Sequence, residues 1–511
     1  MALQSVAMQA GLSSILNTVN DVIQGLGPTV LLPIIIFVIA MVFRVPLGRA
    51  VRSSVLIGVG FQGIFLVLGL FSDNISPLAQ RMVEVTGISL PAVDVGWPAA
   101  AAIAFGIAEI GVWMIPVFVV LNLALFAIGF TFTLDVDIWN YWHFAFIAGL
   151  VYMVTDSLLY SFATGLTLGL FVLVAADWTQ PAVEETFDTE GISIPHGGSV
   201  PFAIAAIPIN WVIDQTPLGN VDADPDSVQD KLGLFGEPIF VGLILGILLG
   251  IAAYSNALFE ASSWYTILGA GVAFAAVMYI LPMMVGILME GLTPLSESIR
   301  DYMTSRFEGR DFAIGLDSAI LIGHESTIAA SLIMVPIAIV MSIILPFNDM
   351  LWGVDLATFP FLLALMVPIM DGNVVKMVIS MTVLLIPLHY VASQVAPAMT
   401  RAAGQAGFDL GGNNLITAGS DPGSPATGLL MLGEPAGLIA GLVVTLACWL
   451  ALRTWPKRMY MVAGASEEKA QETVRIRHSG PSAGILPNKI GGEPEIVEPE
   501  PEPEDEPATD D

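Results

Sequence analysis

Long apolar segments separated by short polar ones fill most of the chain. Several of them are long enough to cross a hydrocarbon layer of about 30 Å as helices. The segments expected to be apolar helices are residues 28–43, 54–71, 99–129 (in two pieces), 144–159, 161–176, 238–254, 265–289, 314–322, 327–345, 358–370, 374–395 and 436–452. This pattern predicts an all-α polytopic membrane protein.

Three other segments do not fit a simple crossing. Residues 199–209 are apolar but too short to span, which predicts a re-entrant hairpin. Residues 1–26 predict an amphipathic helix at the membrane surface. Residues 177–194 are hydrophilic and predict a connecting stretch.

Basic residues set the expected orientation. Two clusters follow apolar segments, and they consist of Arg44, Arg49 and Arg52, and of Arg453, Lys457 and Arg458. The positive-inside rule places both clusters in the cytoplasm, with the N-terminus outside and the C-terminal tail inside. That arrangement requires an odd number of crossings, and we expect about 11 transmembrane helices plus re-entrant hairpins.

Composition supports a membrane protein. The 511 residues are 55% hydrophobic and 12% charged, whereas a soluble domain carries about 25% charged residues. The net charge is −29, and residues 493–511 alone hold ten acidic residues and no base. This Pro- and Glu-rich stretch predicts disorder. The acidic loops suggest a halophile, and the charge disfavours nucleic-acid binding.

Polar and aromatic residues at the ends of apolar segments are the candidate site. Charged and polar groups within a membrane are costly unless they line a cavity or bind a substrate. The candidate substrate-binding residues are Asp94, Trp97, Trp139, Asn140, His143, His196, Glu237, Asp317 and His324. Hydrogen-bonding groups beside aromatic rings suit a sugar or polyol.

Spacing suggests how some of these residues meet. Asp137, Asn140 and His143 are three apart and would share one face of a helix, although a belt of aromatic residues at the membrane interface is the alternative. Asp317 and His324 are two helical turns apart and would also point the same way.

Several kinds of chemistry lack their signatures. Three histidines near acids, His143, His196 and His324, show no short-range ligand pair, so no metal site and no cofactor are expected. The single cysteine excludes a disulfide framework, and no Walker or Gly-x-Ser-x-Gly motif occurs. Residues 235–246 and 432–442 share Gly-Glu-Pro before an apolar run, which suggests an internal repeat or only common helix-start chemistry.

Several blocks of the chain resemble a known family. The blocks, in chain order, are DVGWP (94–98), DIWNYWH (137–143), EGISIPHG (190–197), KLGLFGEP (231–238), GLTP (291–294) and GLDSAILIGH (315–324). Together they resemble the galactitol-type membrane subunit, component IIC (EIIC), of the sugar phosphotransferase system (PTS).

The resemblance implies a fold similar to that of the ascorbate-type component IIC, which is a homodimer with a core domain and a dimer-forming scaffold domain. It implies a permease whose sugar or polyol is phosphorylated by a cysteine phosphate on the soluble component IIB, itself supplied by component IIA. The membrane subunit would then hold no phosphoacceptor residue, and whether it counts as an enzyme stays open.

The expected organisation follows from the same resemblance. Residues 1–26 form an amphipathic N-terminal helix, 27–455 the transmembrane domain, and 456–511 a cytoplasmic tail that is acidic and disordered from about 480. Glu237 and His196 are the candidate orienting acid or base for the attacked hydroxyl. The alternative is an ion-coupled secondary transporter of a polyol on the same fold, in which Asp317 or Glu237 is the coupling carboxylate.

Overall fold

The computed structural model describes residues 28–86, 90–107, 109–221, 225, 237–306, 312–408 and 415–478. The predicted N-terminal helix and the acidic end of the tail lie outside these residues. The described part is built from helices and six very short strands, in agreement with the predicted all-α polytopic class. Six of its helices are long and apolar enough to cross a membrane, or seven if one bent pair counts as a single span.

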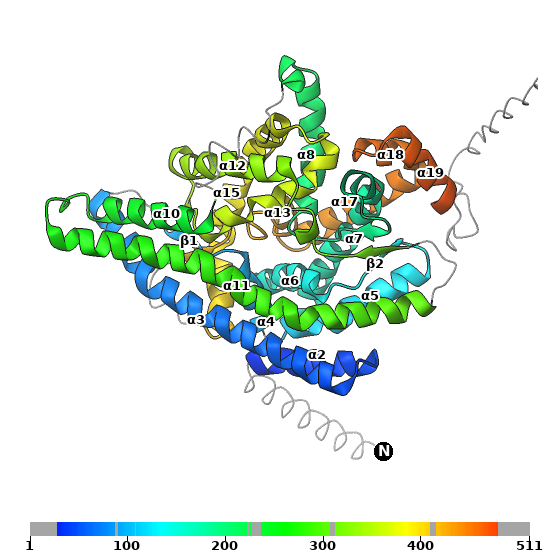
Figure 1. Cartoon of the computed structure of the whole chain (residues 1–511), viewed down its shortest axis with the longest axis horizontal. Helices are drawn as coiled ribbons and strands as arrows, with labels where there is room; N and C mark the ends of the chain where they lie inside the picture. The colour runs from blue at the N-terminus through cyan, green and yellow to red at the C-terminus, as the bar shows by residue number, and fades with distance from the viewer. Residues whose placement is uncertain are drawn as a thin grey trace, which may run out of the picture.

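Four helices form a layer along one side of the molecule (Figure 1). They are α2 (Pro28–Val42), α3 (Leu47–Thr86), α10 (Pro238–Ala253) and α11 (Ala261–Arg306). Glycines allow α3 and α11 to pack closely, because a Cβ at Gly291 would lie 2.6 Å from the carbonyl oxygen of Ser53. A Cβ at Gly60 would lie 2.7 Å from the Cβ of Leu288. Small residues at such crossings are typical of membrane helix pairs.

Most of the other helices surround the short strands on the other side of this layer (Figure 1). They are α4 (Trp97–Gly106), α5 (Gly111–Ala127), α6 (Tyr141–Thr155), α7 (Leu158–Phe187), α8 (Val200–Asp214), α12 (Glu325–Ile344), α13 (Phe359–Ala364), α14 (Met366–Ile369), α15 (Val374–Gln405), α16 (Pro425–Leu430) and α17 (Ala436–Thr454). The pair α4 and α5 is bent by 89°. This bend agrees with the prediction that residues 99–129 form two pieces.

Six strands form two separate three-stranded parallel sheets. They are β1 (Ala92–Asp94), β2 (Thr133–Asp135), β3 (Ile192–Ser193), β4 (Ala313–Gly315), β5 (Met350–Leu351) and β6 (Leu415–Thr417). The order is β5-β1-β6 in the first sheet and β2-β4-β3 in the second. Each half of the chain thus gives the central strand of one sheet and both outer strands of the other.

The order of the strands relates the two halves of the chain differently from the Gly-Glu-Pro sequence that residues 235–246 and 432–442 share. Strands β1, β2 and β3 correspond in order to β4, β5 and β6. Helices α10 and α11 precede β4 as α2 and α3 precede β1, so the first Gly-Glu-Pro opens the second half of the chain, whereas the second precedes α17, which comes after the last strand, β6. The two segments therefore occupy non-equivalent places, and their likeness does not mark the repeat.

Two sequence predictions about local structure were wrong. Residues 314–322 are not an apolar helix, because β4 is followed by the 3-10 turn η3 (Ser318–Ile320). The hydrophilic stretch after residue 176 continues α7 to Phe187. The first acid of this stretch, Asp177, is buried. Both of its carboxylate oxygens accept the backbone N–H of Phe132, which offsets the cost of burying them.

The chain beyond α17 folds back on the molecule as two further helices, α18 (Pro456–Val462) and α19 (Glu467–Arg477), here called the C-terminal cap. The cap packs on the end of α7, where Trp178 and Ala182 contact Tyr460 in a small apolar cluster. Lys469 Nζ lies 2.6 Å from Glu184 Oε1. The first part of the predicted tail is thus ordered.

Candidate functional site

A cavity of about 410 Å³ lies where the two strand sheets approach the α10–α11 layer. Its polar lining residues are His143, His196, Asp317, Thr358, Ser420 and Asp421. Its aromatic lining residues are Trp97, Trp139, Trp142 and Phe361. Among the described residues that line it there is no Lys or Arg.

Strand ends place these side chains. After β2, Asp137 caps the 3-10 turn η1 (Ile138–Asn140) by accepting the backbone N–H of Trp139 at 3.1 Å, and α6 begins directly after this turn. After β4, Asp317 caps η3 by accepting the N–H of Ala319 at 2.7 Å. Such side-chain acceptors satisfy N–H groups that a short helix leaves free.

His143 and Asp421 form the shortest contact between charged or ionisable groups in the cavity. His143 Nδ1 lies 2.6 Å from Asp421 Oδ1, and their side chains are 1% and 3% exposed. His143 belongs to α6, which follows β2, whereas Asp421 follows β6. The contact therefore joins segments that leave different strand sheets.

A second histidine–carboxylate pair lies beside the first. His196 Nε2 is 3.6 Å from Asp317 Oδ2, and the centroids of the His143 and His196 rings are 4.4 Å apart. The backbone N–H of Ser199 donates to His196 Nδ1 at 3.1 Å. Nδ1 is therefore the acceptor nitrogen of a neutral His196, and Nε2 carries the hydrogen that faces Asp317.

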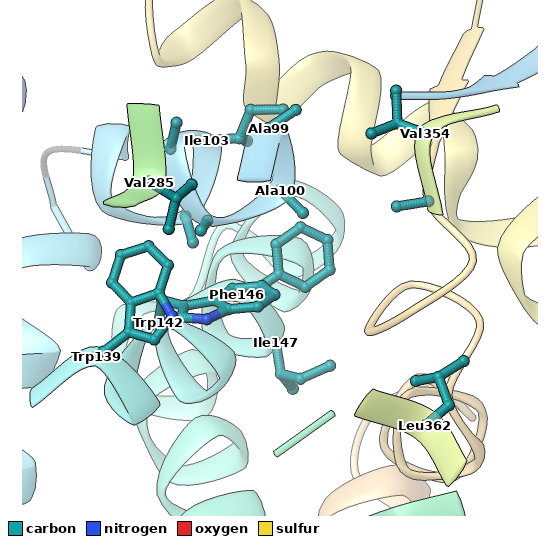
Figure 2. Close-up of a cluster of buried hydrophobic side chains, with 14 of the residues drawn as sticks. Ala99, Ala100, Ile103, Trp139, Trp142, Phe146, Ile147, Val285, Val354 and Leu362 are labelled. Atoms are coloured by element: carbon teal, nitrogen blue, oxygen red, sulfur yellow. The ribbon is translucent and has the colours of Figure 1, made fainter. Parts of the chain in front are cut away.

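Aromatic rings form one wall. The ring centroids of Trp97 and Trp139 are 6.1 Å apart with an interplanar angle of 77°, and Phe361 lies 6.0 Å from Trp97. Trp139 and Trp142 lie close together, with Val285 of α11 beside them and Leu362 farther across (Figure 2). Flat apolar faces of this kind can cover the C–H surfaces of a carbohydrate chain.

Four lining residues each keep one buried polar atom without a hydrogen-bond partner among the described residues. These atoms are Trp142 Nε1, His143 Nε2, Ser420 Oγ and Asp421 Oδ2. Buried polar atoms are rarely left unsatisfied, because each costs about 1–3 kcal/mol. Their gathering around one cavity indicates a ligand that supplies both donors and acceptors.

The structure brings together five of the nine predicted site residues. Trp97, Trp139, His143, His196 and Asp317 line the cavity. The other four are not among its lining residues, and each has a different place in the structure.

Asp94 and Asn140 are buried behind the cavity. Asp94 Oδ2 accepts the N–H groups of Gly353 and Asp355 at 3.0 and 2.9 Å. The side-chain amide of Asn140 donates to Asp135 at 3.2 Å. The predicted common helix face of Asp137, Asn140 and His143 was wrong, because the 3-10 turn η1 separates Asp137 from α6.

Glu237 and His324 lie at helix N-termini. Glu237 is the exposed residue before α10, next to Pro238, which does line the cavity. His324 precedes α12, and its Nδ1 accepts the N–H of Ser326 at 3.2 Å. Asp317 and His324 do not share a helix, since η3 ends between them, and that prediction was also wrong.

Sequence reasoning missed what the segments after β5 and β6 contribute to the cavity. Thr358, Phe361, Ser420 and Asp421 were not among the predicted site residues. Ser420 and Asp421 lie in the stretch Ala418-Gly-Ser-Asp-Pro-Gly423, whose composition is that of an ordinary turn. The usable signal was an acid at the start of an apolar segment, the same feature that selected Asp317.

Comparisons with known proteins agree with this architecture. A family model described as EIIC-GAT, PTS system sugar-specific permease component, matches residues 21–413. The galactitol-specific EIIC component of the PTS of Escherichia coli (strain K12) is 33% identical over 433 residues, which cover 84% of this chain and 94% of that protein.

A second relative from the same strain, a putative permease IIC component, is 34% identical over 441 residues, or 85% of this chain and 99% of that protein. The galactitol-specific EIIC component of Escherichia coli O157:H7 matches with the same identity and coverage as its K12 counterpart. Family membership does not favour the ion-coupled alternative. The chain belongs to the EIIC-GAT family of sugar-specific permease components of the phosphotransferase system.

Proposed function

We propose that this permease subunit translocates galactitol or a similar hexitol and that transport is coupled to phosphorylation of the substrate. The observation that carries the substrate class is a set of four polar atoms around one aromatic-walled cavity that have no hydrogen-bond partner among the described residues. A neutral polyol replaces its lost water contacts with such donors and acceptors. The cavity's volume, about 410 Å³, lies in the range of small-molecule sites. The galactitol-specific relatives support the choice of hexitol.

The proposed partners are the soluble PTS components IIA and IIB, with a cysteine phosphate on IIB as the phosphoryl donor. We also propose a homodimer in the lipid bilayer of the cell membrane, formed through the α2, α3, α10 and α11 layer, and a cytoplasmic C-terminal tail. Exposed apolar side chains on that layer, such as Leu66, Tyr265 and Val272, support the homodimer. Arg453 in the last turn of α17, and Lys457 and Arg458 directly after that helix, support the cytoplasmic tail.

His196 is the candidate for orienting the attacked hydroxyl. Its Nε2 faces Asp317 within the cavity, so the pair can hold a substrate hydroxyl between an imidazole and a carboxylate. A positioned acid or base near the attacked oxygen assists phosphoryl transfer. Glu237 stays a second candidate, at the edge of the cavity beside Pro238.

The test is uptake of radiolabelled galactitol into membrane vesicles that contain the full chain, with and without phosphoenolpyruvate and the soluble PTS components. We expect accumulation of galactitol phosphate only when all components are present. His196→Ala is expected to abolish it, and Glu237→Ala measures the second candidate. Accumulation of free galactitol driven by an ion gradient, without phosphoenolpyruvate, would contradict the proposal.

A further inference from the structure

The pair formed by His143 and Asp421 leaves two polar atoms with no hydrogen-bond partner among the described residues. Their mutual contact of 2.6 Å uses Nδ1 and Oδ1, while His143 Nε2 and Asp421 Oδ2 remain without partners. Both residues line the cavity, and both side chains are almost fully buried. A contact between two buried groups that still leaves an atom unused on each is costly in a folded protein.

The contact also fixes the chemical character of these two atoms. With Asp421 ionised, its carboxylate only accepts hydrogen bonds, and the hydrogen in the contact is assigned to His143 Nδ1. In the neutral imidazole the other nitrogen, Nε2, is then an acceptor. The pair thus presents two acceptors and no donor, which two O–H groups of one molecule can satisfy.

The charge of the cavity adds a second property. Asp317 and Asp421 both line it, and no Lys or Arg does so among the described residues. A phosphate monoester carries a charge of about −1.5 to −2 near neutral pH. Repulsion between like charges is strong where water is largely excluded.

We propose that Asp421 is a specificity-determining residue which, through its pairing with His143, selects a neutral polyol and rejects the phosphorylated form of the same polyol. The inference rests on the proposed function and deepens it. Two hydroxyl groups of the substrate donate to His143 Nε2 and Asp421 Oδ2. Once a hydroxyl carries phosphate, the carboxylates of Asp421 and Asp317 repel it, which favours release of the product.

The experiment measures two affinities of the purified full-length protein in detergent, by calorimetry, for galactitol and for galactitol bearing a terminal phosphate. Asp421→Asn keeps an oxygen for His143 Nδ1 but replaces the second acceptor with a donor and removes the charge. We expect galactitol to bind roughly 10- to 100-fold more weakly, the effect of one lost bond to a charged group. Galactitol phosphate is expected to bind more tightly than it does to the wild type.

The opposite direction of the two changes separates a direct role from a structural one, since a misfolded cavity would weaken both ligands. Asp371→Asn, the same change on an exposed carboxylate, is the control and should alter neither affinity. Monodeoxy galactitols give a second readout. At least one should bind more weakly to the wild type yet equally to Asp421→Asn, because its missing hydroxyl is the one that Asp421 accepts.

The outcomes are distinct. If the wild-type protein binds no galactitol, the proposed function fails and takes this inference with it. If the wild type binds galactitol but Asp421→Asn leaves both affinities unchanged, or weakens both, the role of Asp421 is overturned and the proposed function stands. A thermal unfolding midpoint equal to that of the wild type identifies the variant as folded.

Discussion

Buried carboxylates that lie close together in this fold are used in opposite ways. Asp94 and Asp355 lie beside the backbone of Gly96 and Trp97, and their oxygens accept hydrogen bonds from neighbouring backbone and hydroxyl groups. Asp421 keeps one oxygen unpartnered among the described residues, and it lies in the cavity lining. The first group holds backbone segments in place, and the second is available to a ligand.

The difference lies in what surrounds each carboxylate. Asp94 is the last residue of β1, and its Oδ2 accepts two N–H groups from the segment after β5. Asp355 receives the N–H groups of Trp97 and Ser420, so it joins the segments that follow β1 and β6. The two acids therefore tie together all three strand ends of the first sheet. A buried acid identified from sequence can thus serve the scaffold as readily as the substrate.

The largest effect is expected at Asp94. In Asp94→Asn, an amide nitrogen replaces one carboxylate oxygen. This nitrogen donates hydrogen bonds and cannot accept them, so at least one backbone N–H loses its partner and faces another donor. We expect a loss of roughly 2–4 kcal/mol in the free energy of unfolding, because hydrogen bonds to charged groups contribute about 1.5–3 kcal/mol each. The thermal unfolding midpoint of the purified protein measures it, with Asp371→Asn as the control. A folded Asp94→Asn protein of normal stability that fails to bind galactitol would reverse the assignment.

The sequence predicted the class of fold and half of the cavity for identifiable reasons. Apolar length reveals membrane helices, and Trp139 and His143 stand out because polar and aromatic groups are conspicuous within an apolar segment. Ser420 and Asp421 do not stand out, because their stretch has the composition of a surface turn. Their burial depends on β6 pairing with β1, more than 300 residues earlier in the chain. Two- and three-residue strands carry too short an alternation to be recognised.

Ser420 takes part in both the scaffold and the cavity, through its backbone and its side chain. Its backbone N–H donates to Asp355 Oδ2 at 2.8 Å and serves the scaffold. Its Oγ lies near the same carboxylate but makes no well-aligned hydrogen bond to a described residue, and it belongs to a cavity-lining side chain. Ser420→Ala removes only the hydroxyl. We expect galactitol affinity to fall by about 5- to 30-fold, corresponding to roughly 1–2 kcal/mol, with an unchanged unfolding midpoint. Lowered stability with normal affinity would show that the hydroxyl serves the fold.

The smallest effect concerns the C-terminal cap, where a buried ionisable group lies far from the cavity. Burial, reinforced by the guanidinium groups of Arg453 and Arg477, lowers the pKa of His478 to about 3. His478 Nε2 lies 3.0 Å from the hydroxyl oxygen of Tyr460, so the neutral ring helps hold the end of α19 against α18. An imidazole in an unfolded segment has a pKa of about 6.5. Between pH 3 and about 6.5, His478 therefore binds a proton only when the cap is detached.

The docking of the cap is therefore fully stable above pH 6.5 and weakens as the pH falls toward 3. Each pH unit in this window costs up to about 1.4 kcal/mol from this group. The measurement is the protection factor of the amides in residues 456–478, which divides out the intrinsic pH dependence of exchange, at pH 7.5 and 5.5. We expect lower protection at the lower pH. His478→Gln should remove most of this difference while leaving galactitol affinity unchanged at pH 7.5. If the protection factors of the wild type are the same at both pH values, the buried imidazole does not control the cap.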